Sequence, residues 1–324
     1  EEELRFVLEH SGACGLFLVK SFRGNPMFEI ANRALVGLET VREVTDMEDK
    51  KALFSRVSAQ TDFPNVKPQD VAQIQYTSGT TGVPKGVVLR HAAVLNSAKF
   101  FAGRAKINQE SIWANFVPTF HTAGCVASVL GALNAGCVMY LVKAFEPEGL
   151  LRLIEEQKIS TFFAVPTMVL SAIEAQERKP RDLSSMKMIV SGGALVPPEL
   201  VCSATQTFNC HFECVYGMTE TSPVIAQTFA TDTIQDTCDT VGQAMPHVSV
   251  SIRDPKTNDV VPVGQVGEVC VSGPTVMKGY HDDPIATEQT IDSDGWLHSG
   301  DLGVMDERGY FSISGRLKDM IIRG

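Results

Sequence analysis

The sequence predicts an α/β protein: layered, mostly parallel sheets with helices, followed by a smaller all-β subdomain that forms a distorted barrel. Between about residues 91 and 225, helical segments alternate with short apolar segments, which is typical of a parallel sheet covered by helices. After about residue 226, short strand-like runs are separated by Gly, Pro, Asn and Asp turns. We therefore expect α/β subdomains over residues 1–225 and a β subdomain over residues 226–324.

Each expected element rests on a local pattern. A short helix begins near residue 4 and ends at Gly12, and the apolar run 15–19 suits a buried strand. Residues 21–66 are mixed and polar, and predict only connecting structure. Residues 71–76 alternate at period two, which indicates a strand, and a helix is expected over 91–105. Further strands are expected over 137–142, 161–165, 186–190, 248–252, 260–261 and 266–271, and further helices over 147–157 and 166–178.

Composition limits the classes of function. The chain has 324 residues, of which 44% are hydrophobic and 20% charged, enough for a large core. Its formal net charge of -10 disfavours nucleic acid and anionic lipid as bulk partners, while leaving room for a local positive site. There is no run of about 18 uninterrupted apolar residues, so no integral membrane segment is expected.

The 8 cysteines are scattered through the chain. No CxxC pair and no Cys/His set at zinc spacing is present, and the pair Cys210 and Cys214, with His211 between them, lacks a second ligand pair. Dispersed thiols indicate a reducing compartment, so we expect an intracellular protein, with cytoplasm, mitochondrion and peroxisome equally compatible. The sequence does not predict an oligomeric state.

The segment 77–86 carries the strongest chemical signal. Four hydroxyl residues, three glycines and Lys85 stand between an expected strand and an expected helix. Glycines let backbone N–H groups approach a ligand, hydroxyls donate to phosphate oxygens, and lysine adds a positive charge. The segment is not a G-x-x-x-x-G-K-[ST] loop, because Lys85 follows Pro84 and precedes Gly86. A polyphosphate cradle and a Gly/Ser/Thr surface turn both fit this composition.

Three shorter segments add weaker signals. In 216–221, an aromatic residue beside Gly can stack on a base, and the hydroxyl and carboxylate beyond it can reach phosphate and Mg²⁺. In 295–303, Asp301 can accept hydrogen bonds from two ribose hydroxyls, and in 315–322 Arg316 suits a ribose or phosphate oxygen. Taken singly, a capped strand end, an Asx-turn and a solvated turn explain the same residues.

Together and in this order, the four segments resemble the adenylate-forming superfamily, which includes acyl-CoA synthetases, luciferases and amino-acid adenylation domains. The resemblance covers residues 71–324, and 77–86 is similar to the family's phosphate loop almost letter for letter. The block 118–124 is most similar to medium-chain fatty acyl-CoA synthetases. It lacks the Asp that holds the substrate amine in amino-acid-activating domains. Residues 267–269 and 277–280 match blocks that are expected to be structural rather than chemical.

The resemblance implies a role for each site residue. The ATP phosphates would be bound by Thr77, Ser78, Gly79, Thr80, Thr81, Gly82, Val83, Pro84 and Lys85. The AMP moiety would be lined by Gly193, Cys214, Val215, Tyr216 and Thr219, with Asp301 on the ribose and Arg316 on ribose and phosphate. Glu220 would bind Mg²⁺, and His121 and Gly193 would border the acid. A core histidine is the alternative interpretation of His121. Catalysis would fall to Lys85, Thr219 and Glu220.

The implied activity is ATP-dependent ligation of a carboxylic acid, expected to be a fatty acid, to CoA through an acyl-adenylate. An aryl-CoA ligase or a luciferase-like adenylating enzyme is the alternative within the family. The chain stops at residue 324, just past Asp319, which in the family lies at the hinge to a C-terminal lid domain that carries a catalytic lysine. With that lid absent and the N-terminal layer incomplete, we expect a core fragment with little activity, or one that binds nucleotide and acyl groups without turnover.

Overall fold

The structure is a computed structural model that describes residues 1–55, 64–77 and 83–319. The chain divides into two compact units: the N-terminal unit holds residues 1–67 and 76–86, and the main unit holds residues 68–75 and 87–324. Strands and helices alternate through most of the main unit, which confirms the α/β class. Among the described residues, no helix is long and apolar enough to cross a membrane.

The N-terminal unit contains three helices and several short strands within the residues that are described. They are α1 (Glu2–Ser11), β1 (Gly15–Leu18), β2 (Ser21–Phe22), β3 (Asn25–Pro26), α2 (Met27–Ala34), β4 (Glu43–Asp46) and α3 (Lys50–Ser55). Gly12 ends α1 in the left-handed conformation, with φ of 63°, which glycine adopts without strain. Strand β1 pairs in parallel with β4. The region 21–66, which the sequence left without assigned elements, therefore holds short but regular ones.

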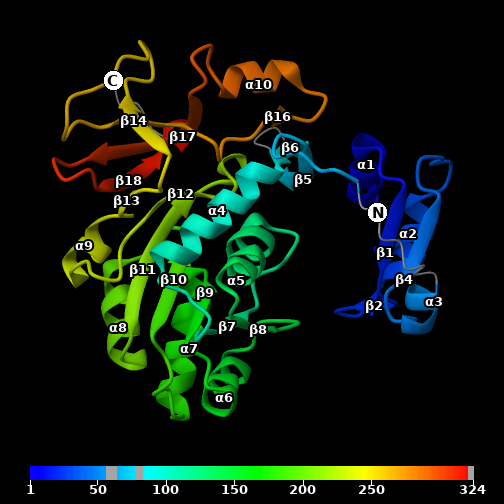
Figure 1. Ribbon diagram of the computed structural model, residues 1–324, viewed down its shortest axis with the longest axis horizontal. Helices are drawn as coiled ribbons and strands as arrows, with labels where there is room; N and C mark the ends of the chain where they lie inside the picture. Colours follow the sequence, from blue (N-terminus) through cyan, green and yellow to red (C-terminus); the bar gives the residue numbers. More distant parts are fainter. Residues whose placement is uncertain (56–63, 78–82, 320–324) are drawn as a thin grey trace. The chain divides into compact units, whose positions relative to one another are not determined.

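A seven-stranded sheet forms the centre of the main unit (Figure 1). Its strands, in spatial order, are β13 (Gln243–Ala244), β12 (Val224–Gln227), β11 (His211–Gly217), β10 (Met188–Gly192), β9 (Thr161–Ala164), β7 (Ile112–Asn115) and β8 (Val138–Leu141). The five strands from β11 to β8 are parallel, whereas β12 and β13 join antiparallel. The strand pairing thus changes from parallel to antiparallel at β11, and polar segments follow the ends of the strands at this point.

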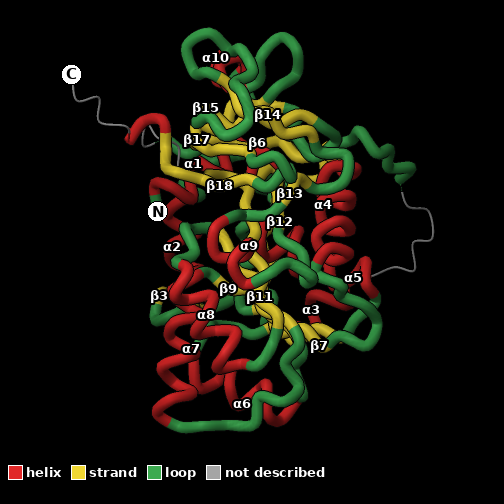
Figure 2. The backbone as a smooth tube through the Cα atoms, turned by 90° about the vertical axis from the view of Figure 1, so that its left-hand side faces the viewer, coloured by secondary structure: helices red, strands yellow, loops and turns green. Residues whose placement is uncertain are grey.

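Helices cover both faces of this sheet. One face carries α4 (His91–Arg104), the π-helix η1 (Ala123–Leu130) and α5 (Gly131–Ala135), and the other carries α6 (Pro147–Gln157), α7 (Pro166–Arg178) and α8 (Pro198–Phe208). Figure 2 shows the strands between α4 and α5 on one side and α7 and α8 on the other. The last three helices each begin with Pro at the first helical position, where the missing N–H costs no hydrogen bond.

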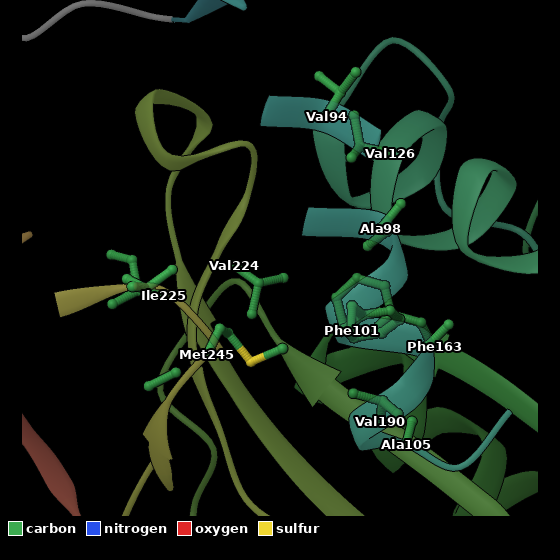
Figure 3. Close-up of a cluster of buried hydrophobic side chains, with 14 of the residues drawn as sticks. Val94, Ala98, Phe101, Ala105, Val126, Phe163, Val190, Val224, Ile225 and Met245 are labelled. Carbon is green, nitrogen blue, oxygen red and sulfur yellow. The ribbon is translucent and has the colours of Figure 1, made fainter. Parts of the chain in front are cut away.

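Consecutive residues of the central strands point into two different cores. Phe162 and Ile189 pack under α6, α7 and α8, whereas Phe163 and Val190 pack under α4. Figure 3 shows Phe101 of α4 against Phe163, with Val190 close by. Because both faces are covered, β9 and β10 are buried along their whole length, which explains the apolar runs at 162–164 and 188–190.

The C-terminal part is rich in antiparallel strands. A four-stranded sheet has the order β14 (Ser249–Arg253), β15 (Gly267–Ser272), β17 (Leu297–Met305) and β18 (Phe311–Arg316). It is accompanied by the short helices α9 (Ile234–Asp239) and α10 (Pro284–Thr290), the 3₁₀ turns η2 (Thr219–Thr221) and η3 (Leu317–Asp319), and the strand β16 (Gly279–Tyr280). The strand expected over 260–261 is wrong: Val260 makes only an isolated bridge to Arg253.

The strand before the expected phosphate loop is confirmed as β5 (Val71–Thr77). The helix expected over 91–105 is confirmed as α4, which begins at His91, and the strand β6 (Lys85–Arg90), which the sequence did not predict, precedes it. Strand β6 lies between β5 and β16 in a three-stranded sheet. Its apolar residues at 87–89 are buried, which favours a strand. In the sequence, the Gly and Pro of the preceding turn hid this short apolar run.

Candidate functional site: a cavity beside Tyr216, Asp301 and Arg316

A cavity of about 470 Å³ opens in the main unit where the parallel strands give way to antiparallel ones. It is lined by Gly193, Ala194, Leu195, Val196, Cys214, Val215, Tyr216, Gly217, Thr237, Cys238, Asp239, Thr240, Val241, Asp301, Ile313, Ser314, Gly315 and Arg316. Crevices at the carboxyl ends of strands, where a sheet changes direction, are where α/β folds bind ligands. Six residues expected around a nucleoside monophosphate therefore share one cavity.

Three of these residues form a connected polar group. The Tyr216 hydroxyl donates a hydrogen bond of 2.8 Å to Asp301 Oδ2, and Arg316 Nε lies 3.2 Å from Asp301 Oδ1. The Asp301 side chain is 13% exposed and that of Arg316 is 68% exposed. Burial, and then the negative charge of Asp301, raise the pKa of Tyr216, so the phenol stays protonated and remains a donor. The carboxylate is thereby held in one orientation at the cavity wall.

Strand pairing places the carboxylate and the guanidinium side by side. Asp301 of β17 and Arg316 of β18 are direct partners in the antiparallel register. The Asp301 backbone N–H also donates to Ser299 Oγ at 3.0 Å. Gly315, at φ of 154°, leaves the wall beside Arg316 without a side chain. The two residues are thus presented by one two-stranded ribbon.

Another part of the cavity wall comes from the ends of β10 and β11. Gly193 has φ of 80°, a conformation that glycine adopts without strain, and turns the chain away from the sheet. Cys214 is buried, and its thiol donates to the Thr237 carbonyl at 3.3 Å. Burial raises the pKa of Cys214 to about 12, so this thiol is a packing residue and not a nucleophile.

The segment after β12 supplies residues that the sequence did not single out. Residues 237–241 line the cavity, from the end of α9 onward, and Ile313 and Ser314 of β18 join them. The sequence carries a local signal for α9. Thr233 Oγ1 accepts a hydrogen bond from the Asp236 N–H, and the Asp236 carboxylate accepts one from the Thr233 N–H. This capping box marks a helix start, but nothing in it indicates a ligand.

Thr219 and Glu220 lie on the turn η2, directly after β11, and both are buried. Glu220 Oε1 accepts a hydrogen bond of 2.8 Å from the Tyr280 hydroxyl, and the Glu220 carbonyl accepts from the Met277 N–H at 2.8 Å. Burial, followed by the Glu220 charge, raises the pKa of Tyr280. Among the described residues, the cavity wall includes neither Thr219 nor Glu220.

His121 is exposed just before the π-helix η1. The Ala123 N–H donates to His121 Nδ1 at 3.2 Å, so this nitrogen is unprotonated. Partial desolvation lowers the pKa of the His121 imidazole, which also favours its neutral form. Position 124 requires glycine, because a Cβ there would collide with the carbonyl of Pro118. His121 is not among the residues that line the cavity, so its role at an acid pocket stays a prediction.

The ends of the expected phosphate loop are described: Thr77 ends β5, and Lys85 begins β6 after Val83 and Pro84. Ser78, Gly79, Thr80, Thr81 and Gly82 lie outside the described residues. Thr77 and Lys85 belong to the N-terminal unit, whereas Tyr216, Asp301 and Arg316 belong to the main unit.

Comparison with known proteins gives one consistent result. The family model for the AMP-binding enzyme matches residues 1–281. The chain is 34% identical to YngI of Bacillus subtilis (strain 168) over 350 aligned positions, which cover 99% of this chain and 64% of that protein. It is 34% identical over 261 positions to the mitochondrial medium-chain acyl-CoA ligase ACSF2 of Bos taurus, which covers 79% of this chain and 42% of that protein.

Among solved structures, the O-succinylbenzoate coenzyme A synthetase MenE of Bacillus subtilis, in complex with AMP, superposes with a TM-score of 0.84. It is 27% identical, and the match covers 99% of this chain and 62% of that one. The chain therefore spans between about two fifths and two thirds of the length of the proteins it resembles.

Proposed function

Because the chain belongs to the AMP-binding enzyme family, we propose that it is the nucleotide-binding body of an ATP-dependent carboxylic acid–CoA ligase. The observation that carries the proposal is the polar group of Tyr216, Asp301 and Arg316 at the wall of the cavity. A buried carboxylate beside an exposed guanidinium suits a sugar bearing two hydroxyls next to a phosphate.

In this proposal the AMP portion of ATP lies in the cavity. Asp301 accepts hydrogen bonds from the ribose hydroxyls, and Arg316 donates to the ribose and the α-phosphate. Gly193, Cys214, Val215 and Tyr216 surround the base, where the open backbone at Gly193 and the Tyr216 ring offer flat surfaces. The cavity of about 470 Å³ has the size of a small-molecule site.

The remaining roles concern charge. Residues 77–85 bind the β- and γ-phosphates, because hydroxyls, backbone N–H groups and Lys85 are the donors that polyphosphate requires. Glu220 binds Mg²⁺, for which a carboxylate oxygen is a preferred ligand. The Glu220 carboxylate accepts a hydrogen bond from the neutral Tyr280 phenol, a partner that brings no positive charge to it. Mg²⁺ supplies neutralisation of the phosphate charge.

The reaction has two steps. The substrate carboxylate attacks the α-phosphorus of ATP, which forms an acyl-adenylate and releases pyrophosphate. The CoA thiol then attacks the acyl carbon and releases AMP. The residues of this chain orient the reactants and neutralise charge, with Thr219 and Lys85 near the phosphates and His121 and Gly193 beside the acid.

The first candidate substrate is a fatty acid of medium chain length. The sequence identity to the medium-chain acyl-CoA ligase of Bos taurus supports it. An aromatic acid is the second candidate, supported by the structural match to the O-succinylbenzoate coenzyme A synthetase. Pyrophosphate release measured across C2 to C18 and aromatic acids separates the two. Preference for acids near C8 supports the first, and preference for aromatic acids supports the second.

The nucleotide site is tested by thermal unfolding with AMP and with ATP plus Mg²⁺. Ligand binding to the folded state raises Tm, and we expect this rise in the parent chain and its loss in Asp301→Ala. A Tm that neither nucleotide raises would refute the proposed site. Nucleotide binding without pyrophosphate release for any acid would support the alternative, a fragment that binds nucleotide and acyl groups without turnover.

A further inference from the structure

A second group of chemically active side chains lies on the four-stranded sheet. Glu268 and Cys270 of β15 and His298 of β17 each direct one metal-binding atom toward the others, and all three atoms lie within 4.8 Å of one another. Glu268 and Cys270 are buried, and His298 is half-buried. None of the three belongs to the cavity wall or to the roles proposed above.

Strand register brings the three together. Cys270 and His298 are direct cross-strand partners, and a register shift between Glu268 and Cys270 interrupts the regular pairing. Residues two apart in a strand share a face, so Glu268 and Cys270 lie on the same side of β15. With the register shift between them, both side chains contact the His298 imidazole. His298 Nδ1 lies 2.8 Å from Glu268 Oε2 and 3.5 Å from Cys270 Sγ.

These distances suit a divalent ion of the zinc class. Zn–N bonds of about 2.0 Å and Zn–S bonds of about 2.3 Å at tetrahedral angles place nitrogen and sulfur about 3.5 Å apart. The Cys270–His298 separation already has that value. The Glu268–His298 separation of 2.8 Å is a hydrogen bond, so a shared proton stands where the ion would be.

The outer partners are those that orient metal ligands. Asp292 Oδ2 lies 3.5 Å from the other imidazole nitrogen of His298, Nε2, which is the carboxylate–histidine arrangement found behind metal-bound imidazoles. Asp292 is itself fixed by the Trp296 N–H at 2.8 Å and by Arg253 at 3.6 Å. Glu268 Oε1 accepts from the Gly300 N–H at 2.9 Å, which leaves Oε2 for the ion.

We propose that Glu268, Cys270 and His298 form a binding site for a divalent transition metal such as Zn²⁺. The ion takes one oxygen, one sulfur and one nitrogen from the chain, and water completes four-coordination. Binding displaces the Cys270 thiol proton, which is released to solvent, and the neutral imidazole binds through Nδ1 with its one proton on Nε2, which faces Asp292. The sulfur ligand selects against Mg²⁺ and Ca²⁺, so this site is distinct from a magnesium site at Glu220.

The test begins with purified protein stripped of metal by a chelator and titrated with Co²⁺, which reports its ligands in its absorption spectrum. We expect one equivalent to bind, with a sulfur-to-cobalt charge-transfer band in the near ultraviolet that added Zn²⁺ abolishes. Cys270→Ser should lose the band and bind Co²⁺ at least tenfold more weakly. Cys14→Ser, which removes an exposed thiol on the N-terminal unit, should keep both.

Two measurements keep the test decisive if Cys270→Ser fails to fold. X-ray absorption on the zinc-loaded parent protein should show one sulfur among nitrogen and oxygen ligands, and Mg²⁺ in excess should not displace the ion. Absence of the charge-transfer band from the parent, or its persistence in a folded Cys270→Ser protein, would overturn the proposal. In that case the three side chains serve only as a hydrogen-bond network between β15 and β17. All these readouts are independent of nucleotide binding and ligase activity.

Discussion

The Tyr216 hydroxyl donates a 2.8 Å hydrogen bond to Asp301, although the two residues lie 85 positions apart in the chain. The contact joins the end of β11 in the seven-stranded sheet to β17 in the C-terminal sheet. The cavity of the main unit is therefore built by both of these sheets. Mutations on either side of this bond separate its structural role from its role in binding.

Asp301→Asn should weaken AMP binding about tenfold to a hundredfold, because hydrogen bonds to a charged acceptor contribute about 1.5–3 kcal/mol. Isothermal titration with AMP measures the change. Asp294→Asn removes the same charge from an exposed turn before β17 and should leave affinity unchanged. Equal affinity in the parent and Asp301→Asn proteins would contradict the assignment of this carboxylate to the ribose.

Glu220→Gln should remove most of the gain in ATP affinity that Mg²⁺ confers, because the amide lacks the negative charge that the cation requires. The measurement is the ratio of ATP dissociation constants with and without Mg²⁺. Tyr280→Phe keeps the carboxylate and should retain the ratio, as should Glu288→Gln on the exposed face of α10. A full magnesium effect in Glu220→Gln would exclude Glu220 as the ligand.

Stability should fall as pH rises from about 5 to 8, because of the buried residue Glu213. Burial raises the pKa of Glu213 from 4.5 to about 8, although Gln227 donates to it at 2.6 Å and Arg104 lies nearby. The folded state therefore holds a proton that the unfolded chain releases above pH 4.5, so unfolding is favoured progressively until the folded group also ionises near pH 8.

Urea unfolding of the parent and of Glu213→Gln at pH 5.5 and pH 8.5 tests this prediction. The neutral amide has no proton to lose, so the variant should show a smaller drop in unfolding free energy between the two pH values. A drop of the same size in both proteins would assign the pH dependence to other groups.

Phe101→Ala should lower the unfolding free energy by about 3–5 kcal/mol, because it opens a cavity in the core below α4. The Phe101 side chain is fully buried, with its ring centroid 6.0 Å from that of Trp113 and 6.1 Å from that of Phe163. Leu133→Ala on α5, where the residue is 69% exposed, should change stability by less than about 0.5 kcal/mol. Chemical denaturation compares the two, and similar losses would contradict the packing described.

Local chemistry made part of the site predictable. Tyr216, Asp301 and Arg316 each stand next to a glycine and carry a group suited to a nucleotide, so the sequence marked them singly. Their meeting in one cavity depends on the packing of two sheets, which periodicity does not record. The α/β class followed from the alternation of apolar strands and helices, which the structure confirms.

Other features left no readable pattern. The helix α9 spans only Ile234–Asp239 in a polar stretch, too short for a helical periodicity to appear, so its contribution to the cavity was missed. The Glu268–Cys270–His298 group forms across two strands, so its members do not show the close sequence spacing that is typical of metal ligands. The division of roles at the phosphate loop stays a prediction, because Ser78 to Gly82 lie outside the described residues.

The direct pairing of Asp301 with Arg316 has a consequence for folding fidelity. Side chains alternate between the two faces of a strand, so a slip of β18 by one residue would turn Arg316 away from the carboxylate while most backbone hydrogen bonds re-form. Such a misaligned chain would keep its helical content and much of its compactness, yet separate the two side chains that we propose hold the sugar and phosphate. Under the proposed function, recovery of nucleotide binding is therefore a stricter criterion of correct refolding than circular dichroism.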